Sequence, residues 1–361
     1  MSIISIVPRL PPAIDGVGDY ALNLAQQLRK DFGIETHFIV CNPTWTGATQ
    51  IDGFPVSQMS THSADTLLSL LPRDCTATVL LHYVGYGYAK RGCPVWLVDG
   101  LQRWRNASIH RTLITMFHEI YASGRPPWTS AFWLFPLQEN LASRLVQLSD
   151  RPLTSKQGYA DILHKLSQGK HNQIPTLPVF SNIGEPEQVQ TLAQRHRRLV
   201  VFGGRGKRLG VYQNSLAELS YACQFLGIEE ILDIGPTTGL TLSTISNVPI
   251  VERGKLSAQE ISGILLHSLA GFFDYPTDFL AKSTIFAAYC AHGLLPVSAR
   301  CTALPVDGIE PGKHYWLPDQ HATGLKNIEQ MQAIADNAYA WYQTHSLSVQ
   351  AKTFAVHLTS P

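Results

Sequence analysis

The chain has 361 residues, of which 45% are hydrophobic and 15% are charged, and its formal net charge is +1. This composition is typical of a folded globular protein and excludes a disordered chain or a coiled coil. The length is typical of two domains. A net charge so close to zero does not call for nucleic acid, so we expect none among the partners.

The six cysteines are widely spaced and form no C-x-x-C pair, so the sequence supports neither a zinc site nor a disulfide scaffold. Met1 leads directly into an apolar strand, without the basic and hydrophobic regions of a signal peptide. No apolar run reaches the roughly 18 residues that a membrane-spanning helix needs. We therefore expect a cytoplasmic protein.

The first half of the chain alternates short apolar runs with amphipathic segments, which is typical of a doubly wound α/β domain. Strands are expected at 3–7, 36–41, 77–82, 94–98 and 112–117. Helices are expected at 20–30, 63–71, 99–106 and 128–134.

The first expected helix is preceded by a glycine loop, Gly16-Val17-Gly18-Asp19. These glycines come too late after the strand for a dinucleotide fingerprint, and the second strand ends without an acidic residue. Glycines at a helix N-terminus still allow close approach of a phosphate or a sugar to the backbone. A tight turn without a ligand is the alternative.

Two expected strands end in a histidine, at His82-Tyr83 and at His118-Glu119. The C-terminal ends of parallel strands face the ligand crevice, so all four residues are candidates for a site. We take His118 and Glu119 as candidate catalytic residues, and His82 and Tyr83 as candidate acceptor contacts. A structural role is the alternative for each histidine. A metalloprotease motif is excluded, because Ala122 stands where its second histidine would be.

A group of aromatic residues, Trp128, Phe132, Trp133 and Phe135, follows the second histidine. Large apolar side chains are most often buried, so packing into the core is the expected role. A wall for an apolar acceptor is the alternative.

The segment 174–186 contains three prolines and breaks the periodicity, so we place a domain boundary between 182 and 183. The alternation then restarts. Strands are expected at 199–202, 230–234, 249–251, 271–273 and 295–297. Helices are expected at 214–225, 257–267, 285–291 and 327–343.

Two segments of this second domain suit an anion. A glycine-rich basic loop, residues 203–208, follows a strand, and Lys282-Ser283-Thr284 precedes a helix. Helix N-termini and cationic side chains both bind phosphate groups. The first segment is not a P-loop, because Lys207 is followed by arginine. We predict that the two segments form a two-sided diphosphate site, made by Gly204, Arg205, Lys207, Lys282, Ser283 and Thr284. An ordinary helix cap and a solvated turn are the alternatives.

Together these segments resemble the two-domain GT-B glycosyltransferases, in particular retaining family 4. Residues 15–20 resemble the family's first glycine loop at the interdomain cleft, and residues 117–121 resemble its "HE" segment, whose histidine contacts the donor sugar. Residues 203–207 are similar to its diphosphate loop, and 285–297 to the helix and strand after its donor site.

The resemblance implies a fold of two doubly wound Rossmann-like domains facing across a cleft. The N-terminal domain, 1–182, would bind the acceptor, and the C-terminal domain, 183–345, would bind the donor. The last segment, 346–361, would pack back on the first domain, with a frayed tail as the alternative.

The implied activity is transfer of a sugar from a UDP- or GDP-sugar co-substrate to a hydroxyl of a glycan or glycolipid. The resemblance implies retention of configuration, no metal and no covalently bound cofactor, and it leaves room for peripheral contact with a membrane. Cations at the leaving diphosphate would stabilise its developing charge.

One departure from the family affects recognition of the donor. The family usually has two glutamates, which hold the donor sugar and the ribose, where this chain has Phe279 and Ala287. We therefore expect Asp274, Tyr275 or Asp278 to contact the sugar or base. The departure leaves open a scaffold protein without turnover, and the fold leaves open an epimerase or phosphorylase.

Overall fold

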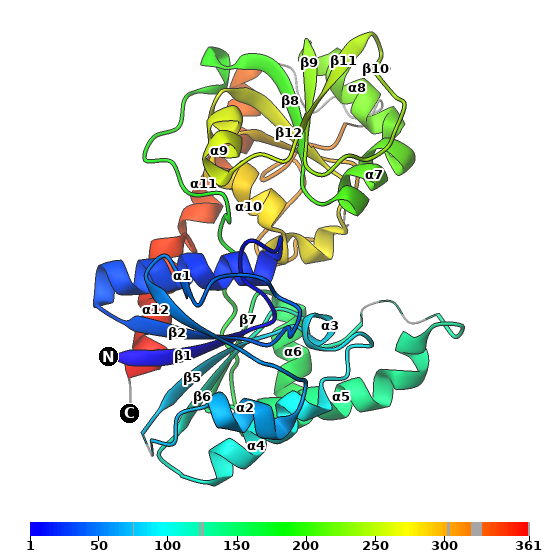
Figure 1. Cartoon of the computed structure of the whole chain (residues 1–361). Helices are drawn as coiled ribbons and strands as arrows, with labels where there is room; N and C mark the ends of the chain where they lie inside the picture. The colour runs from blue at the N-terminus through cyan, green and yellow to red at the C-terminus, as the bar shows by residue number, and fades with distance from the viewer. Residues whose placement is uncertain (75, 123, 125, 302–303, 319–326, 360–361) are drawn as a thin grey trace. The chain divides into compact units, whose positions relative to one another are not determined.

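The computed structural model describes residues 1–74, 76–122, 124, 126–301, 304–318 and 327–359. The chain forms two compact units (Figure 1). Unit 1 consists of Met1–Pro178 and the C-terminal segment that begins at Leu347, and unit 2 is Val179–Ser346. No helix built from the described residues has both the length and the apolar character that crossing a bilayer requires.

Unit 1 is built on a seven-stranded sheet in the order β3-β4-β2-β1-β5-β6-β7. Its strands are parallel except for the β3–β4 hairpin, and they are mostly buried because helices cover the sheet. The strands are β1 (Ser2–Val7), β2 (Glu35–Val40), β3 (Gln50–Ile51), β4 (Phe54–Gln58), β5 (Thr78–Tyr83), β6 (Thr112–Phe117) and β7 (Arg151–Thr154). The helices are α1 (Gly16–Phe32), α2 (Ala64–Leu70), α3 (Gly85–Tyr88), α4 (Val95–Asn106), α5 (Ser130–Leu148), α6 (Gln157–Leu166) and α12 (Leu347–Thr359).

Unit 2 is built on a six-stranded sheet in the order β10-β11-β9-β8-β12-β13. The strands are β8 (His196–Phe202), β9 (Glu230–Ile234), β10 (Thr244–Ile245), β11 (Val248–Gly254), β12 (Ser268–Phe273) and β13 (Leu295–Ser298). The helices are α7 (Arg205–Asn214), α8 (Leu216–Leu226), α9 (Ala258–Leu266), α10 (Thr284–Ala291) and α11 (Ile328–Gln343), with short 3₁₀ helices η1 (Leu192–Gln194) and η2 (Thr277–Lys282). These two α/β units confirm the predicted fold class.

The strand order places a topological switch point in each unit. From β1 the chain runs outward to β2 on one side and returns at β5 on the other. From β8 it runs outward to β9 and returns at β12. In open α/β sheets, ligands bind at the carboxyl ends of the strands beside such a point. The turns after β1 and β5, and those after β8 and β12, are therefore the places to look for sites.

Helix spacing explains how α8 covers the second sheet. Leu219, Ala222, Cys223 and Leu226 recur three and four positions apart, so they share one face and are buried in the core of unit 2. Gly227 ends the helix in the left-handed conformation, where glycine carries no steric penalty. The pattern of apolar residues thus determines which side of α8 faces the sheet.

Two expectations about elements were wrong. Residues 94–98, expected as a strand, lie at the start of α4, where Leu97, Val98, Leu101 and Trp104 form one buried helical face. A short apolar run alone does not distinguish a strand from a buried helix. The glycine-rich loop is also shorter than expected, because α7 begins at Arg205.

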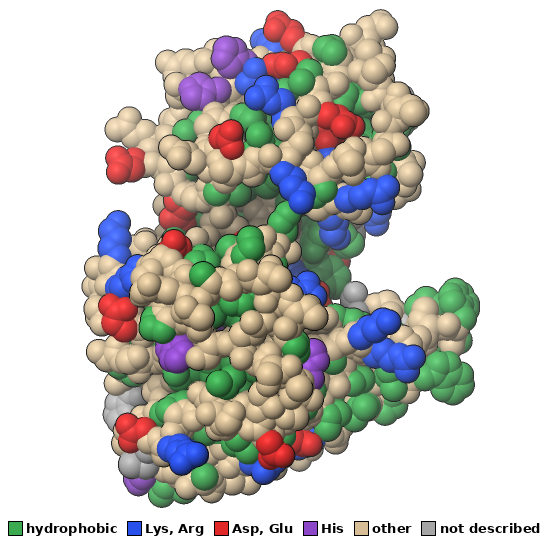
Figure 2. All heavy atoms as spheres, in the orientation of Figure 1, with side chains coloured by type: hydrophobic (Ala, Val, Ile, Leu, Met, Phe, Trp, Pro, Cys, Tyr) green, Lys and Arg blue, Asp and Glu red, His purple; other side chains and the backbone are tan. Residues whose placement is uncertain are grey.

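The expected burial of the aromatic group is also wrong. Trp128, Phe132 and Trp133 are 85%, 42% and 73% exposed, and nearby Leu137 is 39% exposed. We call these four residues the aromatic patch. Figure 2 shows hydrophobic side chains gathered over the N-terminal end of α5, with basic side chains beside them. Phe135 differs from the patch, since it is half-buried and packs edge-on against Tyr121 at a ring-centroid distance of 5.0 Å.

The first turn of α7 is anchored by a buried ion pair. Arg208 is 1% exposed, pairs with Asp233 of β9, and donates to the carbonyl oxygens of Gly203 and Pro236. The Tyr212 hydroxyl donates to the other carboxylate oxygen at 2.8 Å. These bonds tie the turn after β8 to the turn after β9, so Arg208 has a structural role.

We predict that Arg208→Ala destabilises the protein by about 3–5 kcal/mol, because it leaves the buried Asp233 carboxylate without its cation. Urea unfolding measures the change. The exposed neighbour Lys207 provides the control, and Lys207→Ala should change stability by less than about 0.5 kcal/mol. Equal stability of the two variants would show that the ion pair does not anchor the turn.

Candidate functional site

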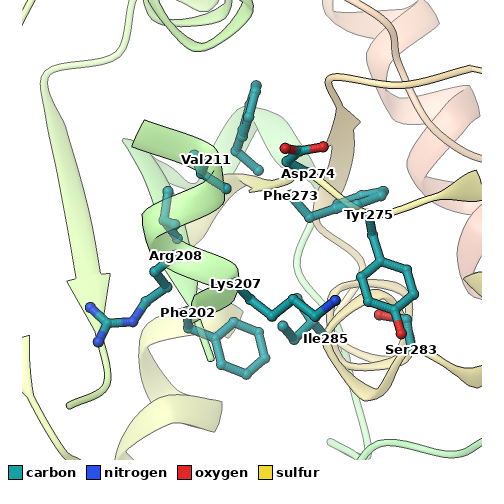
Figure 3. Close-up of a pocket in the computed structure, with 11 residues that line it drawn as sticks. Phe202, Lys207, Arg208, Val211, Phe273, Asp274, Tyr275, Ser283 and Ile285 are labelled. Carbon is teal, nitrogen blue, oxygen red and sulfur yellow. The ribbon is translucent and has the colours of Figure 1, made fainter. Parts of the chain in front are cut away.

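A pocket of unit 2 lies at the switch point between β8 and β12 (Figure 3). Side chains of these strands, of α7 and of the start of α10 line it. The lining residues are Val201, Phe202, Lys207, Arg208, Val211, Phe272, Phe273, Asp274, Tyr275, Ser283 and Ile285. The pocket therefore includes residues from both segments that the sequence indicates as anion-binding.

Close packing brings these two segments together. Gly203 has a φ of 126°, and a Cβ atom added to it would lie 2.6 Å from Cδ1 of Ile285 in α10. Both the backbone conformation and this contact therefore require glycine. The β8–α7 turn and the N-terminus of α10 consequently form adjacent walls of the pocket.

The N-terminus of α10 is capped by Ser283. The Ser283 hydroxyl accepts a hydrogen bond from the Phe286 amide at 3.2 Å, and Ser283 is 5% exposed. The remaining amide groups of the first turn point out of the helix end, where the helix dipole favours an anion. Ser283 thus organises this wall as a cap, and the backbone supplies the donors.

Lys207 brings positive charge to the same pocket. Its ammonium group lies 4.1 Å from the ring centroid of Tyr275, a cation–π distance. Figure 3 shows the Lys207 amine extending toward Tyr275 and Ser283, whereas Arg208 points away from them. A cation therefore lies beside the N-terminus of α10.

The other predicted diphosphate ligands lie near the pocket but do not line it. Arg205 is exposed, and its guanidinium donates to the carbonyl oxygen of Thr238, after β9, at 3.0 Å. Lys282 ends η2, with its ammonium group 5.6 Å from the ring centroid of Phe279. Gly204 caps α7, and Thr284 is the first residue of α10.

The donor sugar and base candidates have different surroundings. Tyr275 lines the pocket beside Lys207, whereas Asp278 lies half-buried in the first turn of η2. Asp274 also lines the pocket, but its carboxylate is paired with Arg300. Arg300 was not predicted as a site residue from the sequence, and it lies shortly after β13, the strand that pairs with β12. The pairing of β12 with β13 brings Arg300 close to Asp274, and the local sequence does not reveal which strands pair.

The two positions where the family usually has glutamates are filled by apolar side chains. Phe279 lies in η2 under Lys282, and Ala287 is 2% exposed within α10. Neither residue can accept a hydrogen bond through its side chain, so recognition of ribose and sugar must come from other groups.

In unit 1, packing accounts for part of the glycine loop. Asp15 caps α1 by accepting hydrogen bonds from the amides of Val17 at 3.0 Å and Gly18 at 3.4 Å. A Cβ atom on Gly18 would lie 2.2 Å from the carbonyl oxygen of Arg9, so glycine is needed there for packing of the preceding loop. Gly16 and Asp19 belong to the same helical turn.

The Asp19 carboxyl group is partly buried beside Asp15. Burial, and secondarily the charge of Asp15, raises its pKa to about 6. Carboxyl groups with such raised pKa values are frequent at functional sites. Asp19 is therefore a group that titrates near neutral pH beside the switch point of unit 1.

The two predicted histidines meet at the ends of β5 and β6. Nδ1 of His82 lies 3.2 Å from Nε2 of His118, and the ring of Tyr20 packs edge-on against both imidazoles. Burial lowers the pKa of His82 to about 3, so this ring is neutral. Within the described residues, Nε2 of His82 has no hydrogen-bond partner.

These contacts favour one arrangement of protons. If His82 donates from Nδ1, its Nε2 is an unprotonated acceptor, and no buried N–H group of His82 is left without an acceptor. His118 then accepts at Nε2 and carries its proton on Nδ1. This tautomer suits His118 as a hydrogen-bond donor toward a ligand.

The C-terminal helix α12 supports the histidine pair indirectly, through Tyr20. The Tyr20 hydroxyl donates to Oε1 of Gln350 in α12 at 2.5 Å. Nε2 of Gln350 donates to the carbonyl oxygen of Pro178, also at 2.5 Å. Helix α12 is thereby joined to α1 and to Pro178, the last residue of the N-terminal segment of unit 1.

The four candidates at these strand ends differ in accessibility. His82 and Tyr83 are fully buried, so neither offers surface that an acceptor could touch. His118 is 7% exposed, and Glu119 is half-buried, with its amide donating to the carbonyl oxygen of Tyr83 at 3.3 Å. Within the described residues, no three His, Cys, Asp or Glu side chains gather as metal ligands would.

We predict that Asp19→Asn stabilises the protein by about 1–2 kcal/mol at pH 7.5, because the folded state raises the pKa of Asp19 and so disfavours its ionised form. The gain should shrink as the pH falls below about 6 and vanish below about pH 3, where the acid is neutral in both the folded and the unfolded state. Urea unfolding at several pH values measures it. An unchanged difference at pH 4 would contradict the assignment.

Comparison with known proteins identifies the fold. No protein-family model matches the sequence, and no curated protein matches it. Solved structures match over nearly the whole chain. An α-glucosyltransferase in complex with UDP-glucose and DNA containing an abasic site has 11% identity and a TM-score of 0.62, with 98% of both chains covered. The α,α-trehalose 6-phosphate synthase from Burkholderia multivorans has 13% identity and a TM-score of 0.61, with 99% of this chain and 98% of that chain covered. WaaG, a glycosyltransferase involved in lipopolysaccharide biosynthesis, has 9% identity and a TM-score of 0.59, with 99% of this chain and 100% of that chain covered.

These structures correct one expectation. The exclusion of nucleic acid as a partner was wrong, because three of the similar structures are α-glucosyltransferases that hold DNA. A net charge near zero describes the whole chain and does not exclude a local binding surface for DNA. In architecture, the chain has the GT-B fold of glycosyltransferases, with two Rossmann-like domains.

Proposed function

We propose that this protein is a glycosyltransferase that binds a nucleotide diphospho-sugar in the pocket of unit 2. The observation that carries the proposal is the meeting of Lys207 and the N-terminus of α10 at a topological switch point. Both features stabilise an anion, and the carboxyl ends of parallel strands are where such folds bind nucleotides. Similar structures of this fold hold UDP or UDP-glucose, which supports a nucleotide sugar as the donor.

In the proposed reaction the bond between the sugar C1 and the diphosphate oxygen breaks, and its electron pair leaves with the diphosphate. A bond forms between C1 and the acceptor oxygen, and the acceptor proton moves to the leaving diphosphate. Lys207 and the amides of the first turn of α10 would stabilise the charge that develops there. The resemblance to family 4 supports retention of configuration and independence from metal. NMR of the product anomer and an assay in EDTA test these two points.

We propose that unit 1 supplies the acceptor side, with His118 as a hydrogen-bond donor and Glu119 beside it. The identity of the acceptor is a matter for a screen of glycans, glycolipids and DNA. DNA belongs in this screen because α-glucosyltransferases of the same fold hold it. A thermal-shift screen of UDP-, GDP-, ADP- and TDP-sugars identifies the donor, since a ligand of the native state raises its stability.

A scaffold protein that binds nucleotide sugar without turnover is the second candidate. The specific observation in its favour is that Phe279 and Ala287 occupy the positions of the family's two glutamates. Nucleotide-sugar binding by calorimetry, together with the absence of both transfer and slow donor hydrolysis, would identify this function.

Lys207→Ala should weaken binding of the nucleoside diphosphate by about 1.5–3 kcal/mol, because it removes a charge-assisted contact. Isothermal titration calorimetry measures the loss. Lys30→Ala, on the exposed end of α1 in unit 1, is the matched control. If the Lys207 variant bound the nucleoside diphosphate with full affinity, the proposed binding site would be wrong.

Arg205→Ala and Lys282→Ala extend this test. Both side chains lie outside the pocket lining, so each should cost less affinity than Lys207→Ala. A loss as large as that of Lys207→Ala would instead support a wider clamp that includes these two cations.

His118→Ala should abolish sugar transfer while leaving nucleotide affinity within about twofold, because the proposed donor site lies in unit 2. His37→Ala is the matched control, since it removes a half-buried imidazole of unit 1 that is hydrogen-bonded to Ser57, away from the histidine pair. If His118→Ala retains full transfer, or if both variants lose activity only in proportion to lost stability, His118 is structural.

A further inference from the structure

The aromatic patch of unit 1 belongs to neither of the two proposed sites. Trp128 and Trp133 are 85% and 73% exposed, and Phe132 packs edge-on against Trp133 at a ring-centroid distance of 5.4 Å. Contiguous exposed apolar surface of this kind marks an interaction site. We infer that the patch docks unit 1 onto an anionic lipid surface.

Helix phase shows that the patch does not serve the core. The core-facing side of α5 is formed by Gln138, Leu141, Ala142, Leu145 and Val146, all of which are buried. The first two turns carry a second apolar side around Phe132, Trp133 and Leu137. Figures 1 and 2 show that this end of α5 projects outward from unit 1, with hydrophobic side chains at its tip.

The charges around the patch suit anionic lipid. No aspartate or glutamate occurs between residues 120 and 138. Lys90 and Arg91 are exposed in the turn after α3. The carbonyl oxygen of Arg91 accepts a hydrogen bond from Nε2 of Gln138 in α5 at 2.9 Å. Nε2 of Gln138 also donates at 3.2 Å to the hydroxyl of Tyr86, which is 41% exposed. These hydrogen bonds hold the turn that carries Lys90 and Arg91 against α5, one residue beyond Leu137 of the patch.

This combination favours a bilayer over a protein partner. Tryptophan rings partition into the interface between headgroups and acyl chains, and basic side chains beside them attract anionic headgroups. A two-fold contact with a second copy would bring Lys90 and Arg91 of both copies close together, where like charges repel.

Vesicle flotation of the full chain tests the inference, with phosphatidylcholine alone and with phosphatidylcholine mixed with phosphatidylglycerol. We expect the protein to float with the anionic vesicles. Trp128→Ser/Trp133→Ser should lower the partition coefficient at least about tenfold, because it removes the inserted rings. Lys90→Ala/Arg91→Ala should lower the partition coefficient about twentyfold on anionic vesicles, and it should leave partitioning into neutral vesicles unchanged.

The matched control is Phe32→Ser/Ile109→Ser, which removes two apolar side chains of unit 1 that are 43% and 81% exposed outside the patch. It should float like the unchanged protein. Circular dichroism melting checks that every variant is folded, and nucleotide binding in unit 2 should be the same in all of them.

Three results would overturn the inference. The unchanged protein could fail to float with either vesicle, or the tryptophan variant could float as well as the unchanged protein. Light scattering could also show a dimer that the tryptophan variant loses, without vesicle binding. The last result would make the patch a contact between two copies of the chain.

Discussion

The pocket of unit 2 depends on the buried ion pair between Arg208 and Asp233. Two charges withdrawn from water are costly unless they are paired and fully hydrogen-bonded, and here the neighbouring carbonyl groups and Tyr212 complete the bonding. Fixing Arg208 inward also fixes the rotation of α7 about its axis. Successive helical residues point about 100° apart, so Lys207 is directed away from β9 and toward α10. One structural arginine thereby sets the direction of the cation next to it.

Unit 1 reaches a similar result without a buried charge. His82 is neutral and fully buried, and its imidazole is hydrogen-bonded to that of His118. Tyr20 packs on both rings and is itself held by Gln350, 330 positions away in the chain. Because Gln350 also bonds Pro178, the histidine pair is supported where the chain leaves unit 1 and where it returns. Orientation of a candidate site thus depends on residues that touch no ligand.

Much of this architecture could be predicted from the sequence, since alternating strand and helix patterns predict doubly wound sheets and Ser283 has the features of a helix cap. The choice among the basic side chains could not be predicted, because it depends on where α7 begins. Treated as a loop, residues 203–208 have no defined phase. Treated as a helix from Arg205, they place Arg208 on the same face as Val211 and Tyr212, which are buried. The pairing of Asp274 with Arg300 needed the order of β12 and β13, which local sequence does not contain.

The aromatic patch is an exception to the rule that large apolar side chains are buried, and the exception has a physical reason. An apolar helix is usually buried, because exposing its apolar side chains to water is unfavourable. On α5 the residues from Gln138 onward satisfy that rule, whereas the two turns before them extend beyond the surface that covers the rest of the helix. Exposure of both tryptophans costs free energy, of which the edge-on contact between Phe132 and Trp133 recovers only part. A protein keeps such an exposed surface when binding recovers that free energy, and the nearby Lys90 and Arg91 indicate the sign of the partner's charge.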